Sequence, residues 1–153
     1  VDERVSVDIG AARISERFGL AGAVSAEIVS DACNAIANEF AVLDGHAGPD
    51  AIVGMGGTVT NLAAVRHALA TYDADVVHGT VLDLNEIDRQ IELYRTRDTA
   101  AREEIAGLQP NRAPVILGGA CIARTILSKL GKDDLTVSDR ALRHGVFADR
   151  VIR

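Results

Sequence analysis

Apolar residues recur every three or four positions along most of the chain, a spacing that places side chains on one face of a helix. Two of these stretches open with residues typical of a helix start. Ser25 precedes one of them, and Asp83 followed by Glu86 resembles a capping box at another. The spacing predicts helices over residues 11–18, 25–43, 62–72, 83–94, 99–106, 115–130 and 140–152.

Three short apolar stretches between these helices have the length of strands. They cover residues 5–9, 51–53 and 135–138. Strands that alternate with helices favour an α/β fold. Tryptophan is absent and aromatic residues make up only 3% of the chain, so the core must be built from Ala, Val, Ile and Leu. With 153 residues, the chain is long enough for a single domain with its own core, and no domain boundary is expected within it.

The start of the helix at 115–130 allows two interpretations. The triplet "VIL" at 115–117 can form a strand that ends before Gly118. Against this, Val115, Gly119 and Ile122 keep the spacing of a helix. We favour one long helix, in which Gly118 and Gly119 lie at a close contact with a neighbouring element.

The charge balance limits the classes of partner. The formal net charge is −6, which argues against general binding to nucleic acid or to a membrane surface. An anionic substrate remains compatible with this charge, because backbone N–H groups and arginines act locally. No apolar run reaches membrane-spanning length and no signal peptide is recognised, so we expect a cytoplasmic protein.

Cysteines and histidines indicate no metal site. Cys33 and Cys121 are far apart in the sequence and lack the spacing of metal ligands, which favours reduced, buried thiols. His46, His67 and His78 have no partner at the spacing of a metal site or a catalytic triad. We therefore expect these histidines on the surface or on helix faces.

The clearest candidate for binding is the stretch "GMGGTVTNLAAV" at 54–65, where a strand turns directly into a helix. The first N–H groups of a helix have no partner within the helix and favour an anion. Gly54, Gly56, Gly57 and Thr58 are the candidate binding residues. We call residues 54–58 the glycine loop.

Two familiar nucleotide motifs do not fit the glycine loop. A dinucleotide fingerprint requires a third glycine where this chain has Val59, and a Walker loop requires a lysine before Thr58. The simpler interpretation is a tight turn with Thr58 as the helix cap. The loop by itself leaves anion binding and this structural role open.

Three further segments give a more specific indication. "DIGAARISERF" at 8–18, "GLQPNRAPVILGGA" at 107–120 and "LTVSDRALRHGVF" at 135–147 stand in fixed order around the glycine loop. Together they resemble the Ppx/GppA phosphatases, over about residues 5–152. The resemblance implies an actin-like ATPase (ribonuclease H-like) fold, a three-layer α/β domain that is one half of a two-domain clamp. It identifies residues 1–153 as a single domain, the second actin-like domain of a longer phosphatase.

The resemblance implies hydrolysis of the terminal phosphate of inorganic polyphosphate or of guanosine pentaphosphate. In that family two phosphate loops and a glutamate that activates water, usually with magnesium, lie upstream of the matched region. We therefore expect no catalytic residue and no magnesium ligand in this chain, and no activity without the N-terminal domain. The stretch "DIGAAR" superficially resembles a phosphate loop, but helical spacing continues through it, so Asp8 and Gly10 are interpreted as structural.

Arg143 is the other candidate for phosphate binding. It lies in "SDRALRHG", where the family pattern is Ser-Asp-x-Gly-Leu-Arg-Glu-Gly, and a guanidinium there can pair with phosphate through two bonds. The alternative is an ion pair with Asp139, which with Ser138 is expected at a helix start. Ala141 and His144 depart from the family pattern.

A different class of function stays open beside the enzyme. The chain can be a non-catalytic module that binds a nucleotide or another anion, or that forms a homodimer. In either case its expected partners are phosphate compounds and protein, rather than nucleic acid or membrane.

Overall fold

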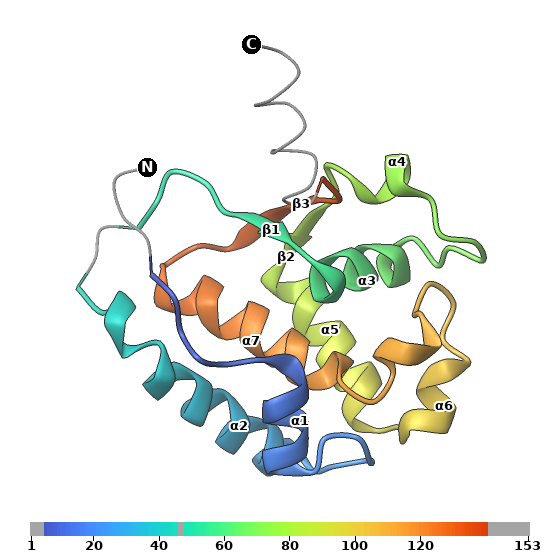
Figure 1. Ribbon diagram of the computed structural model, residues 1–153, viewed down its shortest axis with the longest axis horizontal. Helices are drawn as coiled ribbons and strands as arrows, with labels where there is room; N and C mark the ends of the chain where they lie inside the picture. Colours follow the sequence, from blue (N-terminus) through green and yellow to red (C-terminus); the bar gives the residue numbers. More distant parts are fainter. Residues whose placement is uncertain (1–4, 46–47, 141–153) are drawn as a thin grey trace.

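The computed structural model describes residues 5–45 and 48–140. Figure 1 shows a small sheet lying along one side of a group of helices. The α-helices are α1 (Ala11–Phe18), α2 (Ala26–Glu39), α3 (Gly57–Arg66), α4 (Ala74–Val77), α5 (Leu84–Arg95), α6 (Thr99–Glu103) and α7 (Ile116–Lys129). The other elements are the strands β1 (Val53–Met55), β2 (Val81–Asp83) and β3 (Asp134–Ser138) and the 3-10 turns η1 (Ala41–Leu43) and η2 (Pro110–Arg112).

Both predicted helix starts are confirmed. The Ser25 side chain accepts a hydrogen bond from the N–H of Ile28 at the start of α2. The Asp83 carboxylate accepts one from the N–H of Glu86 at 2.8 Å at the start of α5. The Glu86 carboxylate turns away from Asp83 and accepts hydrogen bonds from Arg89 and Gln90, so the capping box is only half formed.

Helix α7 is the central element of the described structure, and α1, α2, α3 and α5 all pack against it. Residues 116–129 form one continuous helix, so the strand alternative is wrong. Gly118 and Gly119 are needed for two close contacts. A Cβ atom on Gly118 would lie 2.6 Å from Ser15 Oγ, and one on Gly119 would lie 2.6 Å from Thr58 Oγ1. Helix α7 therefore touches both α1 and the glycine loop.

The three-stranded sheet has the order β1-β3-β2. Strands β1 and β3 are parallel, with Met55 opposite Ser138, whereas β2 runs antiparallel to β3. Helix α3 contacts all three strands. The parallel pair brings the ends of two strands that are distant in the sequence to the same edge of the sheet.

The predicted strands need correction at two places. Residues 5–9 form no strand within the described part of the chain; Val5 is 43% exposed and the N–H of Ile9 bonds locally to the carbonyl of Val7. Strand β1 runs from Val53 to Met55 rather than over residues 51–53. Strand β2 was not predicted, because three residues with only Leu82 buried carry no recognisable pattern.

The predicted helices have the right positions but several wrong ends. Helix α2 ends at Glu39, α3 runs from Gly57 to Arg66, and α6 ends at Glu103. Apolar residues keep helical spacing beyond these ends because the turns that follow still pack on the core; Phe40, for example, is only 9% exposed. The short helix α4 was not predicted. The predicted helix at 140–152 falls outside the described residues except for Arg140.

The thiols differ in part from expectation, whereas His67 and His78 are exposed as expected. Cys121 is buried as expected, but Cys33 is only half-buried. The ring of His67 is 3.1 Å from Thr80 Oγ1 and thus has a structural contact, while His46 falls outside the described residues. Among the described residues, no helix combines the length and the apolar character needed to cross a bilayer.

Candidate functional site

The glycine loop connects the end of β1 to the first turn of α3. Gly56 has φ +100°, a conformation that side chains other than hydrogen rarely allow, and it sits at the N-cap position. No side chain caps α3, so the prediction that Thr58 is its cap is wrong. The first helical bond runs from the N–H of Thr60 to the carbonyl of Gly56. The preceding N–H groups of the helix therefore have no partner within it.

Strand β3 delivers a second group of residues to the same edge of the sheet. Because β1 and β3 are parallel, the segment after Ser138 lies beside the segment after Met55. The strand β3 thus runs toward the glycine loop. Asp139 is held there by the hydroxyl of Tyr72, which donates to Asp139 Oδ1 at 2.5 Å. Burial, followed by this carboxylate, raises the pKa of Tyr72 to about 12.

Arg112 contributes a positive charge that the sequence analysis did not single out. Its guanidinium lies against Gly57, where a Cβ atom would be only 2.5 Å from one terminal nitrogen of Arg112. Gly57 is therefore needed for this close approach. The Nε atom of Arg112 is buried and has no hydrogen-bond partner within residues 5–45 and 48–140. A cation with a free donor thus stands at the N-terminus of α3.

Asn61 holds the Arg112 segment against the glycine loop. Its side chain is almost fully buried. The amide nitrogen donates to the carbonyl of Gly57 at 2.8 Å, and the amide oxygen accepts from the N–H of Gln109 at 2.9 Å. One side chain of α3 thereby joins the first turn of its own helix to the residues that lead into η2.

Arg102 fixes the other end of the same segment from within the core. This fully buried side chain donates to the carbonyls of Leu20, Tyr94 and Gly22 at 2.7, 2.9 and 3.0 Å. A fourth bond, 3.2 Å long, reaches the carbonyl of Ala113, the residue after Arg112. Burial lowers the pKa of Arg102. We call Arg102 and its four carbonyl acceptors the arginine clamp.

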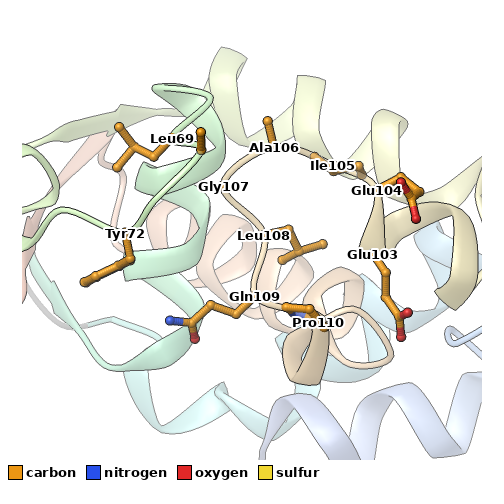
Figure 2. A pocket seen from close by; sticks show the side chains of 11 residues that line it. Leu69, Tyr72, Glu103, Glu104, Ile105, Ala106, Gly107, Leu108, Gln109 and Pro110 are labelled. Atoms are coloured by element: carbon orange, nitrogen blue, oxygen red, sulfur yellow. The ribbon is translucent and has the colours of Figure 1, made fainter.

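Two cavities adjoin these elements. One of about 340 Å³ is mostly apolar and lies between β1, the glycine loop and α7, with Gly54, Thr58 and Gly119 in its wall. The other, of about 370 Å³, is shown in Figure 2, with Tyr72 and Gln109 among the side chains that line it. The wall of this second cavity is formed by the segment after α3 and by residues 103–110, so it is separate from the glycine loop.

Four of the five predicted site residues fall within the described part of the chain. Gly54 lies in β1, Gly56 is the N-cap of α3, and Gly57 and Thr58 are the first two residues of α3. Arg143 lies outside the described residues, and its role stays a prediction. No cluster of His, Cys, Asp or Glu that could hold a metal ion occurs in the described part of the chain.

Sequence reasoning missed Arg112, Asn61 and Tyr72. Arg112 lies in the segment "GLQPNRAPVILGGA", which contributed to the family resemblance without any role for this side chain. A signal was present for Asn61, which is an amide among the apolar residues of "TNLAAV". A polar group on the buried part of a helix requires a hydrogen-bond partner, and that partner is a clue to a neighbouring loop.

Comparison with known proteins supports the family resemblance seen in the sequence. The sequence pattern of the Ppx/GppA phosphatase family matches this chain over residues 1–153. The chain is 30% identical over 155 residues to a bifunctional 3-dehydroquinate synthase/phosphatase of Fusobacterium nucleatum, covering 99% of this chain and 23% of that protein. It is 34% identical over 101 residues to exopolyphosphatase 2 of Mycobacterium tuberculosis, covering 61% of this chain and 31% of that protein.

Similar solved structures belong to the same family. The crystal structure of the Aquifex aeolicus Ppx/GppA phosphatase superposes with a TM-score of 0.91 at 32% identity, over 99% of this chain. The match covers 50% of the Aquifex chain, so the chain spans about half the length of that relative. The expected actin-like α/β fold is confirmed by this likeness.

Proposed function

Since the chain belongs to the Ppx/GppA phosphatase family, we propose that it supplies one wall of a phosphatase site. The enzyme so formed hydrolyses the terminal phosphate of inorganic polyphosphate or of guanosine pentaphosphate, in the cytoplasm. The name of the mycobacterial relative, exopolyphosphatase 2, supports a polyphosphate substrate. The other wall is contributed by an N-terminal domain of the same parent chain.

The observation that carries this proposal is the position of Arg112 at the start of α3. Phosphoryl transfer depends mainly on holding the phosphate and on stabilising charge on its oxygens. The guanidinium of Arg112 lies against Gly57, the first residue of α3, so a cation and the first N–H groups of this helix are neighbours. Arg112 is only partly buried, so its guanidinium can pair with a phosphate oxygen at this place.

The remaining roles are divided between the two domains. In this proposal Gly54 and Gly56 shape the turn, and Arg143 adds a second guanidinium from the segment after β3. The water-activating glutamate and the phosphate loops lie in the N-terminal domain. Magnesium, the expected cofactor, neutralises phosphate charge when bound and takes its ligands there as well, so no step is assigned to a metal in this chain.

The chain alone is expected to release no phosphate from polyphosphate or guanosine pentaphosphate. The physical reason is that a phosphate bound on one wall has no carboxylate to activate water. The measurement is phosphate release by the purified chain of 153 residues, with a mock purification as the control. Steady release above that control would contradict the division of roles between the two domains.

Phosphate binding is the direct test of the wall itself. Titration of the chain with inorganic phosphate is expected to shift the backbone amide signals of Gly57 and Thr58 in NMR spectra, with weak affinity because one wall is missing. Arg112→Ala should reduce these shifts, whereas Arg17→Ala, an exposed arginine on α1, should leave them unchanged. Silence of Gly57 and Thr58 while other amides respond would mean that the loop is only a turn.

The alternative is a non-catalytic module that binds an anion or forms a homodimer. The observation in its favour is an exposed apolar edge, because Val53 and Met55 of β1 are each 59% exposed. Within the described residues β1 pairs only with β3, so its other edge is open to a strand of another chain or domain. Phosphate binding without hydrolysis, even after joining to an N-terminal domain, would favour this alternative.

A further inference from the structure

The two edges of the three-stranded sheet differ in what occupies them. At the β2 edge, the carbonyl of Val81 accepts a hydrogen bond from Arg66 Nη1 at 2.9 Å, so a side chain of α3 is bound there. At the other edge, β1 pairs with β3 alone within residues 5–45 and 48–140. A free edge strand presents unpaired N–H and C=O groups to any strand that can reach it. The β1 edge is therefore the place where this sheet can be extended.

The backbone groups that point to the free edge belong to Val53 and Met55. The carbonyl of Ile52, just before β1, accepts from the N–H of Thr136 on β3 at 2.9 Å. Successive residues of a strand direct their N–H and C=O groups to opposite sides, so Gly54 also faces β3, and Val53 and Met55 face the free edge. These two residues are each 59% exposed. The edge thus combines unpaired backbone groups with two exposed apolar side chains.

The helical layer below the sheet is incompletely covered next to this edge. The apolar cavity of about 340 Å³ lies there, and Ile122 and Ile126, one turn apart on α7, line it and are only partly buried. A Cβ atom on Gly54 would lie 3.0 Å from Leu135 Cδ1, so this residue faces the helices and brings no side chain into the cavity. A strand added beside β1 would cover Ile122 and Ile126 with its own inward-facing side chains.

We propose that the β1 edge binds a strand from the N-terminal half of the parent phosphatase, which thereby completes the sheet of this domain. The proposal rests on the proposed function for the source of the strand. The chain spans about half of the Aquifex phosphatase, so a remainder of similar length is available to supply the strand as well as the other wall. The strand carries valine, isoleucine or leucine at its inward-facing positions, because the cavity that it covers is apolar.

A second copy of this chain fits the edge less well. Two β1 strands related by a twofold axis would pair over only three residues, Val53–Met55. The inward-facing residue of the second β1 would again be Gly54, which brings no side chain to the cavity of either copy. The partly buried isoleucines of α7 would stay uncovered, so the edge favours a strand with larger inward-facing side chains.

The direct test is amide hydrogen exchange, followed by NMR, on this chain alone and on a chimera that joins the N-terminal half of the Aquifex phosphatase to it. In the chain alone, the N–H groups of Val53 and Met55 are expected to exchange rapidly, because they have no acceptor. In the chimera both should become protected. The N–H groups of Thr136 and Val137 already have carbonyl acceptors, so they should be protected in both proteins and serve as the internal control.

A proline at the free edge gives a second measurement. Val53→Pro removes one donor from this edge and leaves the hydrogen bonds between β1 and β3 in place, as proline is tolerated on edge strands. The melting temperature of the chain alone should stay within about 2 °C of the wild type, whereas that of the chimera should fall by about 4 °C or more. Val81→Pro at the opposite edge is the matched control and should affect both proteins equally.

Phosphate release by the chimera is measured separately, because it tests the proposed function rather than the added strand. Protection of Val53 and Met55 without phosphate release would support the strand and contradict the proposed function, and release without protection would do the reverse. Protection in the chain alone that rises with protein concentration would assign the edge to a second copy and overturn the proposal.

Should the chimera fail to fold, the two halves are expressed together as separate chains. Capture of the N-terminal half by this chain, abolished by Val53→Pro and preserved by Val81→Pro, would support the proposal. Absence of capture, or capture that Val53→Pro leaves unchanged, would overturn it.

Discussion

Replacing Arg102 by methionine is expected to lower the free energy of unfolding by about 4 kcal/mol. The arginine clamp joins the carbonyls of Leu20, Gly22, Tyr94 and Ala113 in a buried place. Methionine fills a similar volume but donates no hydrogen bond, so these carbonyls lose a charged partner. Urea denaturation followed by circular dichroism measures the change.

Arg17→Met is the matched control for this experiment. Arg17 lies on the surface of α1, with its nearest carboxylate oxygen, on Glu39, at 3.8 Å. Its replacement should change the free energy of unfolding by no more than about 0.5 kcal/mol. Equal effects of the two replacements would mean that water takes over the carbonyls of the arginine clamp, and that the clamp does not hold the segments together.

Arg112→Ala is expected to reduce kcat/KM by about one to two orders of magnitude, which corresponds to about 1.5–3 kcal/mol for a lost charge-assisted contact. The experiment requires an active protein, and a chimera that joins the N-terminal half of the Aquifex phosphatase to this chain is one way to obtain it. Phosphate release from polyphosphate and from guanosine pentaphosphate is measured for the parent chimera and the variant.

Two further variants give this result its meaning. Arg112→Lys should not restore the lost activity, because an ammonium lacks the planar fork of donors that a guanidinium offers. Arg17→Ala should leave the kinetics unchanged. If Arg112→Ala lowered the melting temperature and left kcat/KM intact, Arg112 would be a structural neighbour of Gly57 and not a phosphate ligand.

The sequence contained most of the helical architecture, because apolar spacing and caps are local signals. Ser25 and Asp83 marked their helices correctly, and the spacing through Gly119 identified α7 as one helix. Strand β2 was not predicted, because the signal that defines it is not local. Its pairing with β3 depends on contacts across the sheet, and three residues carry too short a pattern to reveal them.

The candidate site was predictable only in its backbone part. Glycines at 54, 56 and 57 indicated a turn at a helix start, since their conformation is a local property. Arg112 could not be assigned, because its approach to Gly57 depends on the hydrogen bonds that Asn61 makes to a loop distant in the sequence.

The paired glycines of α7 have a consequence for how the fold holds together. Glycine inside a helix costs about 1 kcal/mol relative to alanine, so Gly118 and Gly119 make the central helix a poor helix on its own. Helix α7 must therefore be stabilised by its neighbours. Gly118 packs against Ser15 of α1, and Gly119 packs against Thr58 of the glycine loop. Formation of α7 thus depends on packing against α1 and the glycine loop, which makes folding strongly cooperative. Partial unfolding of α1 would then weaken α7 and, with it, the contact between α7 and the glycine loop.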